Sequence, residues 1–447
     1  MNLHKLLKER EAASRPVRVV LVGAGKFGSM YLSQARRTPG IHLLAVADLA
    51  PDRARASLAR VGWEPGRLAA RGFDDALKNG TTFITDDTAA AIAHPATEVV
   101  IDATGSPAAG VRNVLLCCEH AKHIVMVNVE ADALAGPLLA RKAAAAGIVY
   151  SLAYGDQPAL ICEQVDWARA AGFEVIAAGK GTKYLPAYHA STPETVWGHY
   201  GFSPERVASG DFNPQMFNSF LDGTKSALEM AAVANATGLN AAPGGLEFPP
   251  CGVDDLPRVL CPKQDGGHLV VRGQVEVISS IERDGRPVFR DLRWGVYVTI
   301  AAGHEYVRKC FNEYGVVTDP GGEYAALYRP SHLIGLELGI SVASVAVRGE
   351  ATGCATGWRA DAVATAKRDL KSGEMLDGEG GYTVYGKLMP ATDSLRMGGL
   401  PIGLAHKMKL LRDIPAGRPL SWNDVAFDAG AEAVKIRREM EGGGAAK

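Results

Sequence analysis

The stretch VRVVLVGAGKFGSMYLSQARR, residues 17–37, decides the fold of this chain. It opens with a short run of valine and leucine that ends directly in a glycine turn, a pattern typical of a buried parallel strand. After the turn, Phe27, Met30 and Tyr31 recur at helical spacing. The stretch therefore predicts a strand, a tight glycine turn and a helix in immediate succession.

The glycine turn itself reads GAGKFG and matches the pattern Gly-x-Gly-x-x-Gly. A second predicted strand, HLLAVAD, ends on Asp48, twenty residues beyond Gly28. A strand before the glycines, a helix after them and an acid at this distance together indicate a dinucleotide-binding Rossmann domain. Backbone N–H groups and the helix dipole would hold the diphosphate. The residues predicted to bind the cofactor are Gly23, Gly25, Lys26, Phe27, Gly28, Asp48, Arg53, Thr104 and Gly105.

The identity of the dinucleotide is open at this level. Asp48 is placed to accept hydrogen bonds from the ribose hydroxyls of NAD, and its charge would repel a 2′-phosphate. Arg53, one turn into the next helix, could instead pair with such a phosphate. Thr104 and Gly105 follow a later strand and are expected to line the nicotinamide ribose, although an ordinary strand-to-helix loop is the alternative.

Alternating strands and helices continue to about residue 155 and predict a doubly wound parallel sheet in an α/β fold. Mixed helices and antiparallel strands then predict an α+β domain, to which the family resemblance described below assigns substrate binding and dimerisation. Its last segment, Arg329 to Val347, is expected to be one apolar helix packed on the Rossmann domain. A weak repeat, AKRDLKSGEML and LLRDIPAGRPL, predicts a small β-rich C-terminal module built from paired strand-turn units. The expected domains are residues 1–155, 156–347 and 348–447.

Composition narrows the class of protein. The 447 residues carry a net charge of −1, which provides no long-range field for nucleic acid or an anionic membrane. No apolar run reaches the length of a membrane span, and the N-terminal segment lacks the apolar core of a signal peptide. We therefore expect a cytoplasmic protein with a small-molecule substrate.

Three polar residues, Asn128, Glu130 and Asp132, follow the strand HIVMV. Carboxylates two positions apart converge only if the backbone turns, and the later Gly136-Pro137 pair suggests a loop there. Such a pair could hold Mg²⁺ or Mn²⁺, or divide acid and base roles. A helix N-terminus enriched in acids, with Asp132 as its cap, is the alternative.

Two lysines, Lys180 and Lys183, lie among glycines in GKGTKYLP after an apolar strand. Lysines in such a loop can bind a phosphate as point charges or polarise a carbonyl group. Solvent-exposed lysines without a ligand are the alternative.

The stretch NSFLDGTKSALEM contains Asn218, Asp222, Lys225 and Glu229. The last three are spaced to share one face of a helix. An aspartate and a lysine in one site could exchange a proton with a substrate hydroxyl. A surface ion pair is the alternative.

These motifs resemble known proteins. GAGKFG, IVMVN and the helix from Asp222 to Lys225 resemble the homoserine dehydrogenase superfamily over about 345 residues, and the C-terminal repeat resembles a SAF domain. Together with NVEADALAGP, GDQPALICEQ and GKGTKYLP, they are similar to the type II, or reductoisomerase-like, 1-deoxy-D-xylulose 5-phosphate reductoisomerases. Homoserine dehydrogenases have Asn-Lys in place of Asn128-Val129, and their acid and lysine stand four apart, so homoserine is disfavoured as substrate.

The resemblance implies reduction and isomerisation of a phosphorylated sugar with NADPH and a divalent metal, in a homodimer. The implied residues fall into three sets: Lys183, Asp222, Lys225 and Asn128 for catalysis, Lys180 and Asn218 for the substrate, Glu130 and Asp132 for the metal. One alternative is an NAD(P)-dependent dehydrogenase of a hydroxy acid or sugar acid. Another is a non-catalytic NAD(P)-binding sensor.

Overall fold

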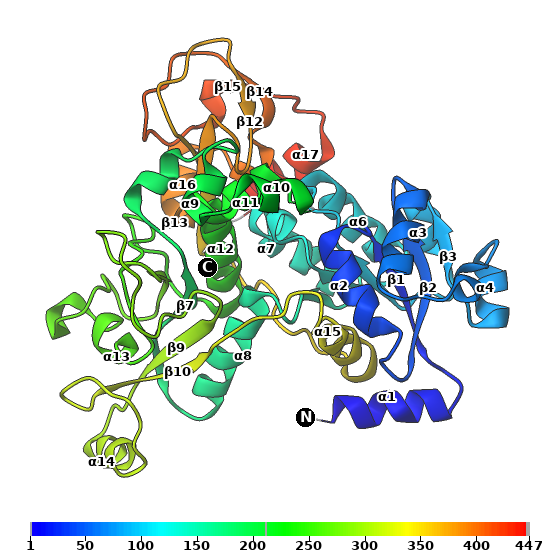
Figure 1. Ribbon diagram of the computed structural model, residues 1–447, viewed down its shortest axis with the longest axis horizontal. Coiled ribbons are helices and arrows are strands. Elements are labelled where there is room, and N and C mark those ends of the chain that lie inside the picture. Colours follow the sequence, from blue (N-terminus) through cyan, green and yellow to red (C-terminus); the bar gives the residue numbers. More distant parts are fainter. Residues whose placement is uncertain (1, 211, 444–447) are drawn as a thin grey trace. The chain divides into compact units, whose positions relative to one another are not determined.

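The computed structural model describes residues 2–210 and 212–443 (Figure 1). The chain divides into two compact units. The first comprises the described residues up to Leu160 together with Leu333–Ala355, and the second comprises Ile161–His332 and the described residues from Thr356 onward. No helix in the described part of the chain is long and apolar enough to cross a membrane.

The first unit is built on a six-stranded sheet in the order β3-β2-β1-β4-β5-β6, with every pair of neighbours parallel. The order reverses between β1 and β4, which is the Rossmann arrangement. This confirms the α/β fold predicted from the glycine turn. The strands are β1 Val17–Val22, β2 Ile41–Ala47, β3 Phe83–Thr85, β4 Val99–Asp102, β5 His123–Met126 and β6 Tyr150–Leu152.

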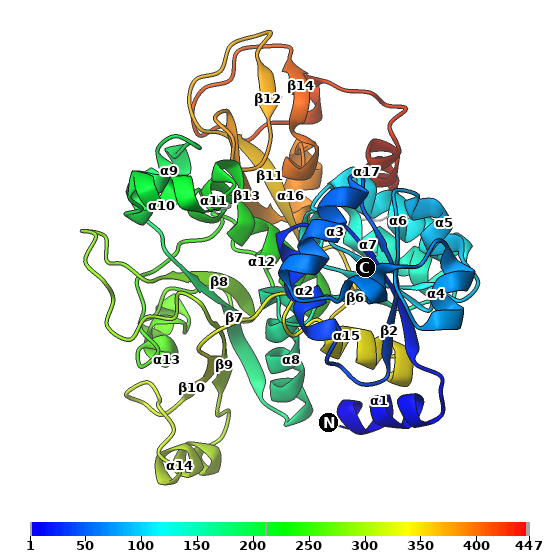
Figure 2. The ribbon, with the colours of Figure 1, turned by 45° about the vertical axis from the view of Figure 1, so that its right-hand side comes forward.

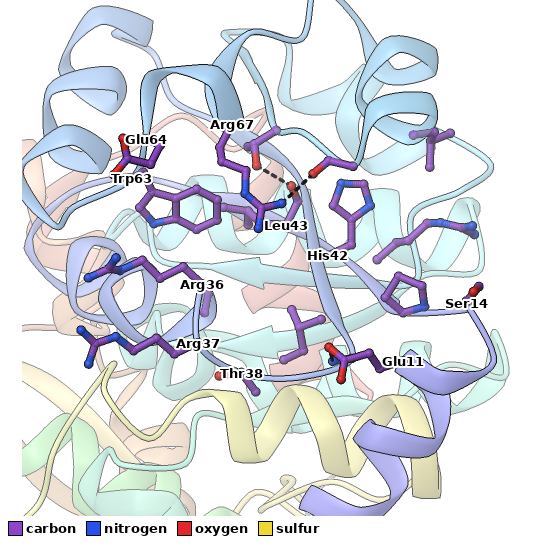
Figure 3. Close-up of a pocket in the computed structure, with 18 of the residues that line it drawn as sticks. Glu11, Ser14, Arg36, Arg37, Thr38, His42, Leu43, Trp63, Glu64 and Arg67 are labelled. Carbon is purple, nitrogen blue, oxygen red and sulfur yellow. Dashed lines mark hydrogen bonds between the residues drawn. The ribbon is translucent and has the colours of Figure 1, made fainter.

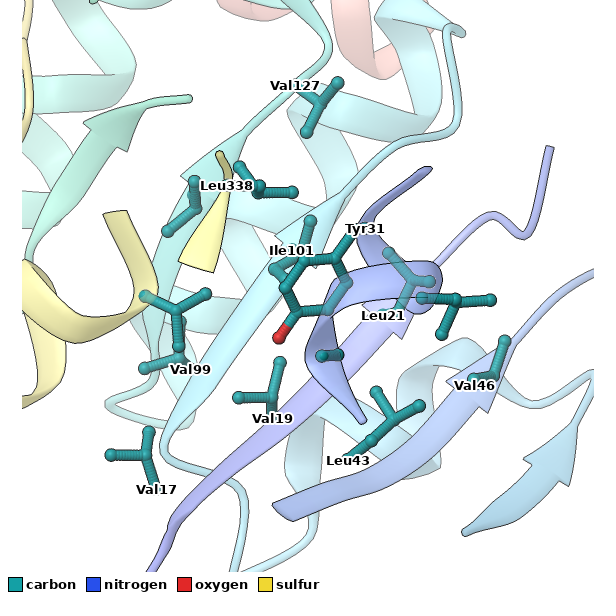
Figure 4. Packing of buried hydrophobic residues seen from close by; sticks show 14 of the residues in the cluster. Val17, Val19, Leu21, Tyr31, Leu43, Val46, Val99, Ile101, Val127 and Leu338 are labelled. Atoms are coloured by element: carbon teal, nitrogen blue, oxygen red, sulfur yellow. The ribbon is translucent and has the colours of Figure 1, made fainter. Parts of the chain in front are cut away.

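Helices cover both faces of this sheet, so its strands are buried almost throughout. On one face, Val19 and Leu21 of β1 share a core with Tyr31 and with Leu338, which belongs to the segment that returns to this unit (Figure 4). The helices of the unit are α1 Leu3–Ala12, α2 Lys26–Ala35, α3 Pro51–Arg60, α4 Phe73–Asn79, α5 Thr88–Ala93, α6 Pro107–Glu119, α7 Val129–Ala145 and α15 Gly339–Ala343.

The predicted helix from Arg329 to Val347 is wrong at its start. Tyr324–Arg329 forms strand β10, and Arg329 pairs with Val296. The helical part begins at Gly339 and ends in a π-helical turn, Ser344–Arg348. Only Arg329 of the predicted helix is drawn into strand pairing, and residues 330–338 form a bend, an irregular segment and a turn before Gly339.

The second unit contains a four-stranded sheet in the order β10-β9-β7-β8, in which only β7 and β8 are parallel (Figure 2). Helix α12, Thr224–Thr237, is buried along most of its length because it packs between this sheet and the strand pair β11 and β13. The other strands of the sheet are β7 Glu174–Thr182, β8 Gln274–Ser279 and β9 Val296–Ala301. The remaining helices before the C-terminal module are α8 Gln157–Ala170, α9 Val196–Tyr200, α10 Pro204–Ser209, α11 Pro214–Leu221, α13 Leu256–Val259 and α14 Glu305–Glu313.

The two copies of the C-terminal repeat pair with each other. Leu370 and Ile414 exchange both backbone hydrogen bonds, at 2.8 and 2.9 Å. Asp369 accepts from the Ala416 N–H, and Asp413 accepts from the Ser372 N–H, each at 2.9 Å. The repeat thus forms paired strand-turn units, as its spacing predicted. The elements are β11 Ala360–Ala366, β12 Met375–Asp377, β13 Val384–Pro390, α16 Ala391–Met397, β14 His406–Leu410, β15 Val425–Ala426 and α17 Glu432–Gly442.

Candidate active site

The three glycines of the turn serve different purposes. Gly23 has φ +93°, and a Cβ there would lie 2.7 Å from the Ala103 carbonyl oxygen. A Cβ on Gly28 would overlap the Gly23 carbonyl oxygen. Gly25 is exposed, and a Cβ there would meet no described atom within 4 Å. Protein packing therefore explains Gly23 and Gly28 but not Gly25.

A bound dinucleotide would explain Gly25, because the diphosphate of a Rossmann cofactor approaches the backbone closely at this position. Gly25 is the N-cap of α2, and among the described residues no side chain caps that helix. The N–H groups of its first turn are the donors that a diphosphate uses. Lys26 begins the helix and is exposed, whereas Phe27 packs on the core, so Phe27 offers a ligand only its backbone.

The acid at the end of β2 is tied to the glycine turn. Asp48 Oδ2 accepts from the Ala24 N–H at 2.8 Å, and Oδ1 accepts from Ala50 at 2.9 Å and from the Arg53 guanidinium at 3.0 Å. Burial alone would raise the pKa of Asp48, but these hydrogen bonds lower it below its usual value. Asp48 is thus ionised and partly neutralised by Arg53, whose side chain is 67% exposed.

Hydrogen bonds with buried polar groups fix the loop after β4. Asp102 accepts from both the N–H and the hydroxyl of Thr104, at 2.9 and 2.7 Å. Asn128 donates to the Ser106 carbonyl at 2.8 Å and to the Thr104 hydroxyl at 3.1 Å, while its oxygen caps α7 through the Ala131 N–H. Asn128 therefore orients the loop that contains Thr104 and Gly105.

Glu130 and Asp132 lie in the first turn of α7, and that helix continues through Gly136 and Pro137. The loop expected there does not form, so the two carboxylates do not converge: residues two apart on a helix face different sides. The N-cap is Asn128 rather than Asp132. In the described part of the chain, no group of three or more His, Cys, Asp or Glu side chains is arranged to hold a metal. The residues present do not fit the predicted divalent cation.

Asp132 has a different environment from a metal ligand. Its Oδ1 accepts from the Tyr150 hydroxyl at 2.7 Å, and its Oδ2 is buried with no hydrogen-bond partner among the described residues. Burial raises its pKa to about 6.

In the second unit, the expected helix face with Asp222, Lys225 and Glu229 is interrupted. Helix α11 ends at Leu221 and α12 begins at Thr224, with Gly223 at φ +92° between them. Asp222 therefore lies at the junction and not on the helix of Glu229. Lys225 is in the first turn of α12 and is partly buried.

Each of the two buried carboxylates has a lysine from a distant segment. Lys367 Nζ lies 2.7 Å from Asp222 Oδ2, and both side chains are almost fully buried. Lys367 also donates to the carbonyls of Ser191 and Gly381, at 2.8 and 2.7 Å. Glu229 forms a buried ion pair with Lys180. Lys180 thus lies in strand β7 and pairs with a buried carboxylate, whereas the sequence predicted a lysine in a loop.

Asn218 is fully buried and bridges two loops. Its amide donates to the carbonyls of Ser191 and Gly380, at 3.0 and 2.8 Å, and its oxygen accepts from the Ser191 hydroxyl at 2.6 Å. These contacts join the α11 segment to the C-terminal module.

Lys183 shares its surroundings with a second cation. Lys183 Nζ lies 6.0 Å from the centroid of the Tyr200 ring, and Arg293 Cζ lies 5.6 Å from the same ring. Lys183 donates to the His199 carbonyl. Burial lowers the pKa of Lys183, and the charge of Arg293 lowers it further. Neither cation has a carboxylate partner within the described residues, so their positive charge is not compensated by a neighbouring acid.

Tyr184, the residue after Lys183, belongs to a chain of hydrogen bonds. Nδ1 of His189 is 2.7 Å from the Asp222 carbonyl, so Nδ1 carries the proton and Nε2 accepts from the Tyr184 hydroxyl at 2.9 Å. Burial lowers the pKa of His189, which keeps the imidazole neutral. The His189 ring also stacks on Tyr385, with centroids 4.4 Å apart. We call Lys183, Tyr184, His189, Asp222, Arg293 and Lys367 the polar centre.

Sequence reasoning did not select Arg293, Lys367 or His189. Their partners are far away in the chain, and no spacing rule connects Lys367 with Asp222. The one local signal was the repeat around Lys367, which identified the module but no role for the lysine.

Comparisons with known proteins bear on the class of the second unit. Residues 155–338, less than half of the chain, match a family described as the catalytic domain of oxidoreductase DRL. No curated protein matches the sequence. The match is therefore to an oxidoreductase catalytic domain, and in this chain it follows a Rossmann domain.

Solved structures resemble the chain only distantly. An Agrobacterium radiobacter oxidoreductase with NAD⁺, L-tartaric acid and magnesium is 16% identical over 37% of this chain and 44% of its own, with a TM-score of 0.28. The 1-deoxy-D-xylulose 5-phosphate reductoisomerase of Zymomonas mobilis with NADPH is 16% identical over 49% and 57%, with a TM-score of 0.33. A probable dehydrogenase from Thermotoga maritima is 12% identical over 75% and 90%, with a TM-score of 0.36. The chain thus matches about half the length of the first two.

Proposed function

We propose that the protein is an NADPH-dependent reductoisomerase that converts 1-deoxy-D-xylulose 5-phosphate to 2-C-methyl-D-erythritol 4-phosphate. The observation that carries the proposal is the pair Lys183 and Arg293, two partly buried cations beside one ring with no acidic partner in the described chain. The resemblance of the sequence to type II reductoisomerases and the match to the DRL catalytic domain support it.

The cation pair suits the phosphate of such a substrate. Two like charges held together in a partly buried setting repel each other, as the lowered pKa of Lys183 indicates. A phosphate dianion would relieve that repulsion and accept hydrogen bonds from both groups. Lys183 and Arg293 would therefore anchor the substrate by its phosphate.

The remaining groups of the polar centre would handle protons. The nicotinamide cofactor, when bound, supplies the hydride for the reduction, and the new alcohol oxygen needs one proton from the protein or solvent. Lys225 at the start of α12 and the hydroxyl of Tyr184 are the candidate donors. Asp222, already paired with Lys367, would act by positioning: its Oδ1 accepts from the Thr224 N–H at 2.9 Å and so orients the turn that presents Lys225.

NADPH is proposed over NADH because of Arg53. This exposed guanidinium partly neutralises Asp48, which weakens the repulsion that Asp48 would exert on a 2′-phosphate. Arg53 would itself pair with that phosphate. The proposed reaction steps assign no role to Mg²⁺ or Mn²⁺, because Glu130 and Asp132 do not converge.

The test is to supply 1-deoxy-D-xylulose 5-phosphate and NADPH, with Mg²⁺ or with a chelator, and to follow the nicotinamide absorbance. We expect oxidation of NADPH and formation of the branched polyol phosphate. Lys183→Ala and Arg293→Ala should each raise KM by about tenfold, equivalent to ~1.4 kcal/mol, and leave NADPH binding unchanged. Lys309→Ala, on α14, is the matched control because Lys309 pairs only with exposed Glu305. Folded protein that oxidises no NADPH above background would refute the proposed substrate.

A second candidate is a dehydrogenase of a hydroxy acid or sugar acid that leaves the carbon skeleton intact. The separated carboxylates Glu130 and Asp132 favour it, since a rearrangement assisted by a metal needs converging ligands. This candidate predicts turnover of a sugar acid with NAD⁺ or NADP⁺, with no change of skeleton in the product.

A further inference from the structure

A cleft of about 660 Å³ opens on the first unit at the amino ends of the parallel strands (Figure 3). Its floor includes Arg18 at the start of β1 and His42 at the start of β2. The glycine turn follows the carboxyl end of β1, so the cleft contains no residue of the cofactor loop. It also contains no residue of the polar centre.

The lining of the cleft is cationic. Four arginines, Arg18, Arg36, Arg37 and Arg67, contribute to it, against two glutamates. None of the four guanidinium groups has a carboxylate partner in the described chain, and Arg36 and Arg67 bond only to the carbonyls of Gly62 and Gly80. In a protein with a net charge of −1, this is a local excess of positive charge without internal compensation.

His42, on the floor of the cleft, is affected by the charges of two of these arginines. Its Nε2 lies 2.8 Å from the Thr81 carbonyl oxygen, so this nitrogen carries a proton. Burial lowers the pKa of His42, and the charges of Arg18 and Arg67 lower it further, against the effect of the Thr81 bond. Arg18, Arg67 and His42 all line the cleft, and Figure 3 shows the Arg67 side chain reaching down toward His42.

Beside these cations stands a rigid aromatic wall. The indole Nε1 of Trp63 donates to the Leu32 carbonyl at 2.9 Å, which fixes the ring. Figure 3 shows the indole next to Arg36 and Arg67, where it lines the cleft. An indole surface next to unpaired guanidinium groups is suited to a ligand that combines a flat ring with an anionic group.

We propose that this cleft binds a phosphorylated small molecule with a planar ring, its phosphate on Arg18 and Arg67 and its ring on Trp63. Guanidinium groups match phosphate oxygens in pairs, which favours a phosphate over a single carboxylate. The site lies apart from the dinucleotide loop, so its ligand would be a second one, bound alongside the cofactor.

The test uses phenyl phosphate as probe and isothermal titration calorimetry on the full chain saturated with NADPH, which occupies the glycine loop. We expect saturable binding that is weakened at least tenfold in Arg67→Gln and in Trp63→Leu. Arg67 is exposed, so its replacement should leave the fold intact, which circular dichroism checks. Arg71→Gln is the matched control, because Arg71 is also exposed, lies four residues away and does not line the cleft.

Inorganic phosphate should bind more weakly than phenyl phosphate, because it makes no contact with Trp63. Equal affinities for the two would refute the role of the indole. Absence of saturable phenyl phosphate binding up to about 10 mM, or binding that is unchanged in Arg67→Gln, would overturn the site. Binding lost in Lys183→Ala instead would assign the probe to the polar centre and likewise overturn it.

Discussion

Replacement of Gly25 by alanine separates cofactor binding from folding. The backbone at Gly25 has φ −69° and ψ −159°, which alanine adopts without strain, and the added Cβ would meet no described protein atom within 4 Å. Alanine at a compatible glycine position gains about 0.4–1 kcal/mol by restricting the unfolded chain. Gly25→Ala should therefore be as stable as the wild type or slightly more stable.

Cofactor binding should respond in the opposite direction. The methyl group would occupy the space that a diphosphate needs in order to reach the N–H groups at the start of α2. Each hydrogen bond to a charged group contributes about 1.5–3 kcal/mol, so the loss of one raises the dissociation constant by at least about tenfold. Titration of NADPH by its fluorescence measures this, and urea unfolding measures stability.

Gly28→Ala provides the contrast. Its Cβ would overlap the Gly23 carbonyl oxygen, so we expect a loss of about 1–3 kcal/mol in stability in addition to any loss of binding. If Gly25→Ala binds NADPH as tightly as the wild type, the reasoning that assigns this glycine to the diphosphate is refuted. A large loss of stability in Gly25→Ala would refute the inference that no protein atom occupies the space beside Gly25.

Three further predictions follow from the contacts of single residues. Arg53→Ala should weaken NADPH about tenfold and NADH hardly at all, in paired titrations; equal losses for both would argue against a 2′-phosphate site. Lys367→Met should cost about 3–5 kcal/mol in chemical unfolding because it leaves Asp222 buried and unpaired, and the double variant with Asp222→Asn should recover part of that loss. Burial raises the pKa of Asp132 from 3.8 to about 6, so its protonated form stabilises the fold below about pH 4 and this contribution is lost as the pH rises through 6. Asp132→Asn should therefore flatten the stability profile across that interval, by up to ~3 kcal/mol, whereas an unchanged profile would contradict the raised pKa.

Sequence patterns alone predicted the Rossmann domain, which the structure confirms, and an expected place for the dinucleotide. Both depend on short-range patterns: a buried strand, glycines at fixed spacing, a helix and an acid twenty residues on. The C-terminal repeat was also recognisable in the sequence. In the structure, the equivalent positions around Asp369 and Asp413 make equivalent hydrogen bonds.

Which charged side chains meet is visible only in the folded chain. Asp222 and Lys225 looked like one helix face until Gly223, at φ +92°, separated them. Glu130 and Asp132 required a turn, yet Pro137 is accommodated within α7. Asp222 is paired with Lys367, and the second cation near Lys183 is Arg293, at sequence separations that no periodicity encodes. Burial brings such residues together, and the cost of leaving a buried charge unpaired makes the pairing of Asp222 with Lys367 specific.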